Sequence, residues 1–178
     1  MKEYLTEGIV LNIEHIDEDN NSVDLYTKEL GRIKAKVIGG RKILSKLMPH
    51  LDVLNLVKLR LVEKKHFIVV DAIAKDIFLE LKNSPKKLAS VLNFFYVFRA
   101  ICYPAEPDFR LWYWLVRSFR LKSFNYHEFL KIIGYDPLIA CCEICGKKKP
   151  EYFSIKDQSF VCYRCHTKFP ENTLLYLK

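Results

Sequence analysis

The sequence lacks the long apolar runs that mark membrane and secreted proteins. No stretch approaches the roughly 20 uncharged apolar residues that cross a bilayer. The most apolar run, Leu88 to Phe98, is interrupted by Ser90 and Asn93. Residues 1–7 contain two glutamates and no apolar core of a secretory signal. We therefore expect a protein of the cytoplasm.

Signatures of several enzyme classes are also missing. The sequence has no G-x-x-x-x-G-K phosphate loop and no H-E-x-x-H metal motif. Its His127-Glu128 pair has neither the H-x-E spacing nor the P-C-x-x-C partner of zinc deaminases. We therefore predict that the protein is not an enzyme. The length of 178 residues leaves room for one ordinary domain or a few small modules.

Acidic residues are scarce between positions 29 and 66. The whole chain has 29 Lys and Arg against 21 Asp and Glu, a net charge of +8. Residues 1–28 hold two basic and seven acidic residues, whereas residues 29–66 hold ten basic and three acidic. A concentrated positive charge favours a polyanionic partner without identifying it.

The first 80 residues show the period-two apolar pattern of β-strands. Apolar residues alternate over residues 9–13, 23–25 and 33–37, and two longer apolar runs cover 53–62 and 67–74. No helix of full length is expected among them. Five short strands in about 75 residues favour a small closed or nearly closed barrel of the OB type.

Beyond residue 80 the apolar period becomes helical. The first helix is predicted from Ser84-Pro85 to about Cys102, because Ser suits the N-cap and Pro the first helical position. Its predicted apolar stripe is Leu88, Val91, Leu92, Phe95 and Phe98. A second helix should begin near Asp108, and a third should run from Asn125 to Gly134. These segments predict a small helical bundle.

Four of the six cysteines form two C-x-x-C pairs. Cys142 pairs with Cys145 and Cys162 with Cys165, and sixteen residues separate the pairs. In a reducing compartment this spacing indicates a four-thiolate zinc ribbon or knuckle rather than disulfides. A short hairpin between the pairs would bring them together. About forty residues bury too little apolar surface to fold alone, so we expect a structural zinc ion with no open catalytic position.

Other cysteine and histidine residues leave alternatives open. Cys141 and His166 adjoin the predicted ligands, and either one is an alternative ligand. Cys102 is interpreted as a small core residue rather than a nucleophile.

A basic strand and the link after it form the candidate nucleic-acid surface. On a strand, alternation with Ile33, Ala35 and Val37 sends the cations of residues 32–36 to one face. The candidate DNA-binding cations are Arg32, Lys34, Lys36, Arg41, Lys42 and Lys46. Tyr26 is a candidate for stacking on bases, as aromatic residues do on OB barrels. The alternative is a solvated surface without a ligand.

The predicted helices add a second group of cations. Arg110, Arg117 and Arg120 are spaced to lie near one helix face. They are candidates for contact with DNA or with an acidic peptide, and the alternative is again a solvated helix face.

Several segments in order resemble the RecO family of bacterial recombination mediators. The N-terminal matches are T-E-G-I-V-L at residues 6–11, D-L-Y-T-K-E-L-G-R at 24–32, and G-G-R-K with S-K-L in 39–47. The C-terminal matches are C-E-I-C-G at residues 142–146, Y-F-S at 152–154 and C-Y-R-C at 162–165. The ordered set is far more specific than any one segment.

This resemblance implies an α+β chain of three modules and a role in DNA repair. The modules are an N-terminal OB-fold β-barrel (1–80), a central helical bundle (81–140) and a C-terminal four-cysteine zinc module (141–178). Members of the family bind single- and double-stranded DNA and anneal complementary strands. They engage the acidic tail of single-stranded DNA-binding protein and, with RecR, help load RecA in the RecF pathway. A cytoplasmic, nucleoid-associated protein is therefore expected.

The sequence departs from the family pattern in two places. Asp157-Gln158-Ser159 stands where the family usually has a Gly-Gly turn before the second cysteine pair. Typical members also continue for several helices beyond the zinc module, where this sequence ends at Lys178. The alternative function is a protein-interaction scaffold with a structural zinc ion and no direct role on DNA.

Overall fold

The computed structural model describes residues 1–177 in two compact units. Unit 1 comprises Met1–Leu88 and Tyr103–Tyr113, and unit 2 comprises Ala89–Cys102 and the chain from Trp114 onward. No helix within residues 1–177 is both long and apolar enough to span a membrane. The division into three modules stays a prediction.

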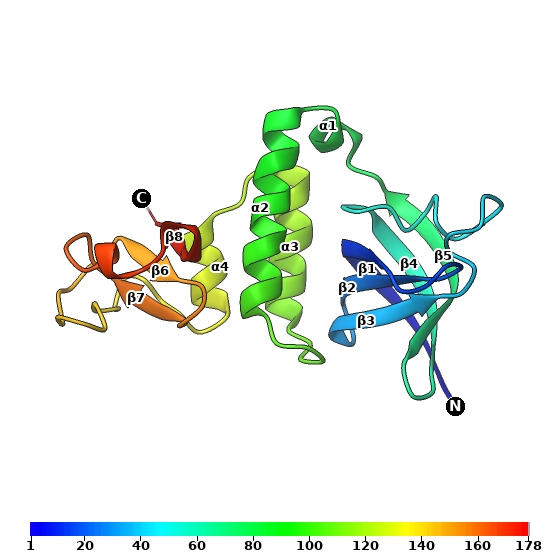
Figure 1. The fold of residues 1–178 in the computed structure, drawn as a ribbon, viewed down its shortest axis with the longest axis horizontal. Coiled ribbons are helices and arrows are strands. Elements are labelled where there is room, and N and C mark those ends of the chain that lie inside the picture. The colour runs from blue at the N-terminus through cyan, green and yellow to red at the C-terminus, as the bar shows by residue number, and fades with distance from the viewer. Residues whose placement is uncertain (178) are drawn as a thin grey trace. The chain divides into compact units, whose positions relative to one another are not determined.

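Unit 1 contains a closed five-stranded barrel. Its strands are β1 (Lys2–His15), β2 (Asn21–Thr27), β3 (Gly31–Val37), β4 (Leu56–Glu63) and β5 (Phe67–Asp76). They are arranged in the order β1-β2-β3-β5-β4 (Figure 1). The long β1 pairs antiparallel with both β2 and β4, and a short parallel pairing of β3 with β5 closes the barrel. This OB-fold-like topology agrees with the five predicted strands.

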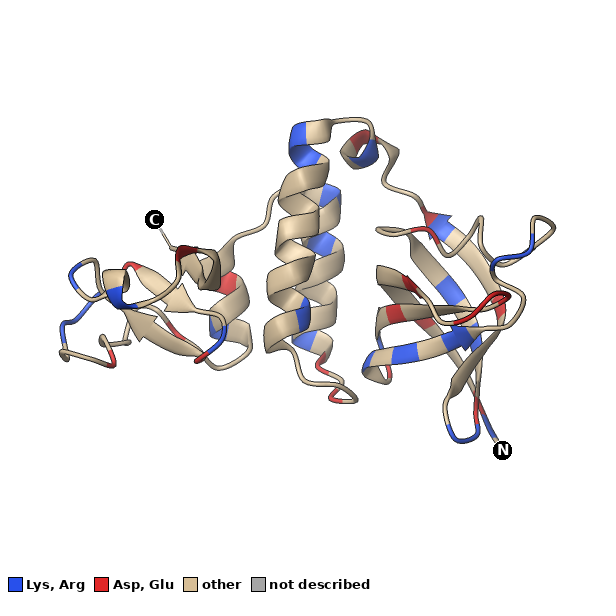
Figure 2. Cartoon of the chain, viewed as in Figure 1, with Lys and Arg blue, Asp and Glu red and all other residues tan. Residues whose placement is uncertain are grey.

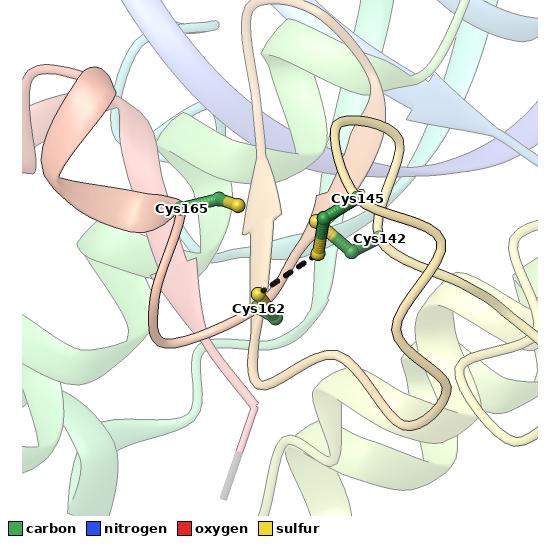
Figure 3. Close-up of side chains that lie close together, drawn as sticks. All are labelled: Cys142, Cys145, Cys162 and Cys165. Carbon is green, nitrogen blue, oxygen red and sulfur yellow. Dashed lines mark hydrogen bonds between the residues drawn. The ribbon is translucent and has the colours of Figure 1, made fainter.

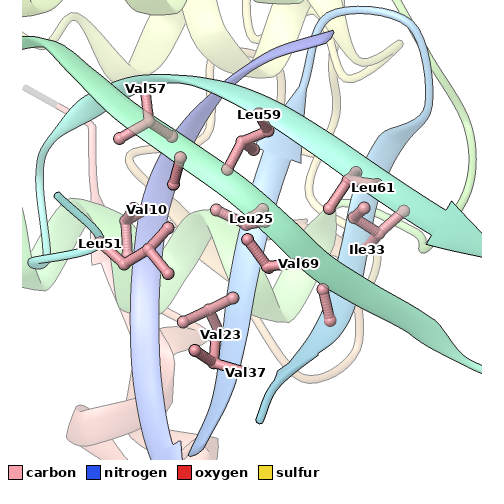
Figure 4. Close-up of a cluster of buried hydrophobic side chains, with 12 residues drawn as sticks. Val10, Val23, Leu25, Ile33, Val37, Leu51, Val57, Leu59, Leu61 and Val69 are labelled. Atoms are coloured by element: carbon pink, nitrogen blue, oxygen red, sulfur yellow. The ribbon is translucent and has the colours of Figure 1, made fainter. Parts of the chain in front are cut away.

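The barrel interior is filled by branched apolar side chains (Figure 4). The alternation of β3 sends Ile33, Ala35 and Val37 inward and its cations outward, as the period of two requires. The buried cluster is Val10, Val23, Leu25, Ile33, Ala35, Val37, Leu51, Val57, Leu59, Leu61, Val69 and Ala72. The predicted run from Val53 forms a strand only from Leu56, because Leu54 turns the chain with a positive φ of 80°.

The chain returns to the barrel at residues 103–113. The N–H of Ala105 donates to the carbonyl of Arg32 at 2.8 Å, and Arg32 also forms a β-bridge with Pro104. Gly31 makes this close approach possible. A Cβ built on Gly31, which has a φ of +65°, would lie 2.5 Å from the carbonyl of Glu106.

Three longer helices follow the barrel: α2 (Pro85–Ile101), α3 (Phe109–Leu121) and α4 (Tyr126–Ile132). A single turn, α1 (Leu79–Lys82), precedes them. The predicted starts are confirmed. Asp108 caps α3 by accepting from the N–H of Arg110 at 2.7 Å, and Asn125 caps α4 by accepting from the N–H groups of His127 and Glu128.

Aromatic side chains form the core of unit 2. Phe94 is fully buried, and its ring centroid lies 4.8 Å from that of Phe124 and 5.3 Å from that of Phe129. The predicted stripe of α2 was partly wrong. Leu92 is 45% exposed, and Phe94 and Ile101 are buried instead. The buried face of α2 differs from the predicted stripe because the large aromatic rings of this helix pack together at three- and four-residue steps.

Unit 2 also carries a small three-stranded sheet in the order β7-β6-β8. Strands β6 (Tyr152–Ser154) and β7 (Ser159–Val161) form the hairpin predicted between the cysteine pairs. The turn uses Gln158 in the left-handed region in place of glycine, and Asp157 accepts from the hydroxyl of Ser154 at 2.6 Å. The 3-10 turns η1 (His166–Lys168) and η2 (Glu171–Thr173) lead to β8 (Leu174–Tyr176), which the sequence did not predict.

We expect Gly31→Ala to destabilise unit 1 more than Gly39→Ala. Both glycines have φ near +65°, which costs an alanine about 1–2 kcal/mol. At Gly31 the new methyl group also overlaps backbone atoms, which adds about 1–3 kcal/mol. At Gly39 it meets only the flexible Lys42 side chain, at 3.6 Å. Urea denaturation would measure the difference, and equal losses would contradict the close approach of residues 103–113.

Candidate functional site

Four cysteine sulfur atoms converge in unit 2 (Figure 3). The Sγ atoms of Cys142, Cys145, Cys162 and Cys165 all lie within 4.8 Å of one another, and those of Cys145 and Cys162 are 3.6 Å apart. Thiolates held about 2.3 Å from a tetrahedral zinc ion are about 3.8 Å apart. The spacing therefore fits one ion. Within residues 1–177 no other group of three or more Cys, His, Asp or Glu residues converges in this way.

Two tight turns present these sulfurs. In the first, the N–H of Gly146 donates to the carbonyl of Cys142 at 2.8 Å, and Gly146 adopts a φ of +70° that favours glycine. In the second, the N–H of Cys165 donates to the carbonyl of Cys162 at 3.0 Å. Cys162 directly follows β7, so the hairpin brings the second turn back to the first.

The four thiols cannot all ionise without a cation. Burial opposes ionisation of Cys142, but backbone N–H groups of Cys162, Cys145 and Ile144 outweigh it and lower the pKa of Cys142 to about 6. Burial, together with hydrogen bonds among the neighbouring thiols, raises the pKa of Cys165 to about 12. The thiol of Cys142 therefore ionises more easily than a free thiol, whereas that of Cys165 ionises less easily. A bound dication would remove that conflict, since metal ligation needs deprotonated sulfur.

The two alternative ligands lie outside the cluster. Cys141 is exposed and forms an isolated β-bridge with Lys148. The ring of His166 stacks on that of Tyr152 at 4.8 Å and 6°, and its Nδ1 hydrogen-bonds to the carbonyl of Tyr163. Neither residue belongs to the converging set.

The three cations of β3 face outward but are each paired with a carboxylate. Arg32 donates to Asp24 through Nε at 3.1 Å and through Nη2 at 3.0 Å, and the Asp24 side chain is only 1% exposed. The other pairs are Lys34 with Glu14 at 3.0 Å and Lys36 with Asp17 at 3.6 Å. The structure brings the predicted cations together on one face, yet acidic residues of β1, β2 and the turn between them offset their charge.

Tyr26 is not a surface residue, which contradicts its prediction as a base-stacking group. It is 1% exposed, and its ring stacks on Trp112 with centroids 6.4 Å apart. Its hydroxyl donates to the carbonyl of Asp108 at 3.4 Å. The return of residues 103–113 therefore covers the outer side of β2 at this point, and nucleic acid cannot reach the tyrosine ring.

The link after β3 is an irregular segment that carries several basic residues (Figure 2). Arg41, Lys42 and Lys46 are all exposed. The backbone N–H of Arg41 donates a hydrogen bond to the carbonyl of Asp19, which fixes the start of this segment. We name residues 41–46 the basic loop.

The basic loop also exposes two apolar side chains that the sequence analysis missed. Ile43 is 101% exposed and Leu44 is 90% exposed. The signal was present in the sequence as an apolar pair between cations, with no strand or helix period to bury it. Exposed aliphatic groups beside cations are the combination that proteins insert between bases.

The three helical cations all lie on α3 and are exposed. Arg110, in unit 1, pairs with the capping carboxylate of Asp108 at 2.8 Å. Arg117 and Arg120 lie in unit 2.

Comparisons with known proteins agree with the sequence resemblance. The family model described as "Recombination protein O N terminal" matches residues 1–73. The DNA repair protein RecO of Alkaliphilus metalliredigens is 24% identical over 175 residues, which cover 90% of this chain and 71% of that protein. The RecO proteins of Caldanaerobacter subterraneus and a Thermoanaerobacter species are 22% and 25% identical, with 90% and 92% of this chain covered and 70% and 71% of theirs. The chain is therefore similar to RecO proteins over most of its length.

The match to the family model covers most of the barrel. Residues 1–73 include β1 to β4 and most of β5. The cysteine cluster lies beyond that match but within a chain of which about nine-tenths aligns with whole RecO proteins. The barrel strands β1 to β4 therefore lie in the matched region.

We expect Cys165→Ser to lower the metal content of the purified chain to well below one ion per chain. The serine hydroxyl is not ionised at neutral pH and cannot replace a thiolate ligand. Cys141→Ser is the matched control, since Cys141 neighbours the cluster but lies outside it. Elemental analysis would measure the metal. Full metal content in Cys165→Ser, or its loss in Cys141→Ser, would contradict the ligand set.

Proposed function

We propose that this chain is a DNA-binding protein of DNA repair that catalyses no covalent step. Its relatives bear the name DNA repair protein RecO. The observation that carries the proposal is the exposed basic loop on an OB-fold-like barrel, because such barrels hold nucleic acid through strand faces and flanking loops.

Within that interface the basic loop makes most of the contacts with nucleic acid. Lys42 and Lys46 neutralise phosphates, and Ile43 and Leu44 contact bases that have left their stack. The β3 face contributes less than its three cations suggest, since each already has an acidic partner. When DNA binds, Lys34 and Lys36 leave their exposed carboxylate partners and pair with phosphates, whereas Arg32 remains paired with Asp24.

Annealing follows from the same charges. Two strands repel each other through their phosphates, and a protein that holds both screens that repulsion and speeds pairing. Cations of α3, including Arg117 and Arg120, supply a second contact for DNA or for an acidic peptide. The acidic tail of single-stranded DNA-binding protein is the proposed peptide, and RecR and RecA are the further partners, in the cytoplasm at the nucleoid.

The proposed metal is zinc in a purely structural role. Four sulfur ligands fill a tetrahedral coordination shell and leave no position for water or substrate. The ion would stabilise a module whose hydrophobic core is small, containing Val161 and Cys162 with Tyr152 and Phe169 packed against it.

We expect Lys42→Glu with Lys46→Glu to weaken binding of single-stranded oligonucleotides by about tenfold or more, regardless of sequence. Removing two phosphate contacts should also lower the slope of log affinity against log salt by about 1.4, at about 0.7 for each contact. Fluorescence anisotropy over a range of salt concentrations would measure both.

Lys156→Glu with Lys168→Glu is the control. It makes the same change in net charge at two exposed residues of unit 2. If both double variants weaken binding equally, the effect is one of net charge and the basic loop is not the interface. If the unaltered chain binds no oligonucleotide yet binds a protein partner, the scaffold function replaces this one.

A further inference from the structure

A hollow on unit 2 is lined by three tyrosines and a carboxylate. Tyr152, Tyr163, Tyr176 and Glu151 surround a cavity of about 250 Å³. Tyr152 of β6 and Tyr176 of β8 are cross-strand partners, with ring centroids 5.3 Å apart. Tyr163 comes from the turn between the second pair of cysteines. The volume lies below the roughly 300–1,000 Å³ of ordinary ligand pockets, so it suits a single head group.

The tyrosine rings and the carboxylate are held in place from several sides. Glu151 accepts from the N–H of Tyr163 at 2.9 Å through its carboxylate, and from the N–H of Leu177 at 2.9 Å through its carbonyl. Tyr152 stacks on His166. Tyr163 and Tyr176 nevertheless remain 64% and 54% exposed, which leaves ring surface open to a ligand.

The chemistry of this hollow favours a positive charge. Tyrosine rings attract cations through their electron-rich faces, and cages of aromatic rings recognise quaternary ammonium groups. Glu151 adds a carboxylate that is only 14% exposed, and Lys147 already approaches it with Nζ 3.6 Å from Oε1. A phosphate group would meet repulsion from Glu151.

We propose that this hollow binds an alkylammonium or guanidinium group, presented by an exposed Lys or Arg side chain of a protein partner. The inference goes beyond the proposed function and does not rest on it, since DNA is an anion and would bind elsewhere. The partner side chain enters between the rings of Tyr163 and Tyr176 and displaces Lys147 from Glu151.

The test is an NMR titration of the full, metal-loaded chain with N-acetyl-arginine amide and N-acetyl-lysine amide. Saturable shifts confined to residues around the three tyrosines are expected with at least one of the two. The neutral citrulline analogue, which has the shape of arginine without its charge, should give none. Tyr176→Ala should weaken binding about fivefold, and Tyr176→Phe should retain it because the ring face persists. Tyr96→Ala is the control, since Tyr96 is an exposed tyrosine of unit 2 that does not line the hollow.

The variant Lys147→Ala tests whether the hollow prefers a cation or an anion. Removing the internal competitor should strengthen cation binding about two- to threefold. An oligo-dT that shifts the same residues, and binds more weakly to Lys147→Ala, would identify a nucleic-acid platform and overturn the proposal. Absence of saturation with both amides, or equal binding of the citrulline analogue, would overturn it as well.

Discussion

The burial of the outer side of β2 controls what the barrel can bind. Tyr26 stacks on Trp112, and Arg32 is paired with the almost fully buried Asp24, so one end of the strand face is occupied by the protein itself. A buried ion pair of this kind does not exchange its partner for a phosphate, because the carboxylate left behind would be unpaired and out of water. The proposed contact with nucleic acid is therefore assigned to the basic loop.

The cysteine cluster plays the corresponding part in unit 2. The sheet of β6, β7 and β8 has three residues in each strand, which is too few to be stable without further support. Sulfur ligands from both sides of the hairpin, joined by an ion, would fix the two turns against each other. This explains how a short C-terminal segment can present ordered side chains on its surface.

Much of this architecture could be predicted from local sequence patterns. The period-two alternation predicted the strands of the barrel, Asn125 predicted a helix start, and the two C-x-x-C pairs predicted the cluster of four sulfur atoms. These features depend on residues close in sequence. The burial of Tyr26 could not be predicted in the same way, because it depends on Trp112, which is distant in sequence. The pairing of the β3 cations depends on how Glu14, Asp17 and Asp24 are placed across the neighbouring strands and turn. Charge counts along a sequence do not reveal which charges are already paired.

Because Tyr163 lies between two of the clustered cysteines, ligand binding in the hollow and metal binding by the sulfurs would be coupled. Its ring is oriented by the turn from Cys162 to Cys165, so the shape of the tyrosine hollow depends on how the sulfurs are held. By thermodynamic reciprocity, whatever factor the ion adds to the affinity for a ligand in the hollow, the ligand adds to the affinity for the ion. If the ion strengthens binding in the hollow, a partner docked there would raise the affinity for the metal, and a chain stripped of metal would bind that partner more weakly.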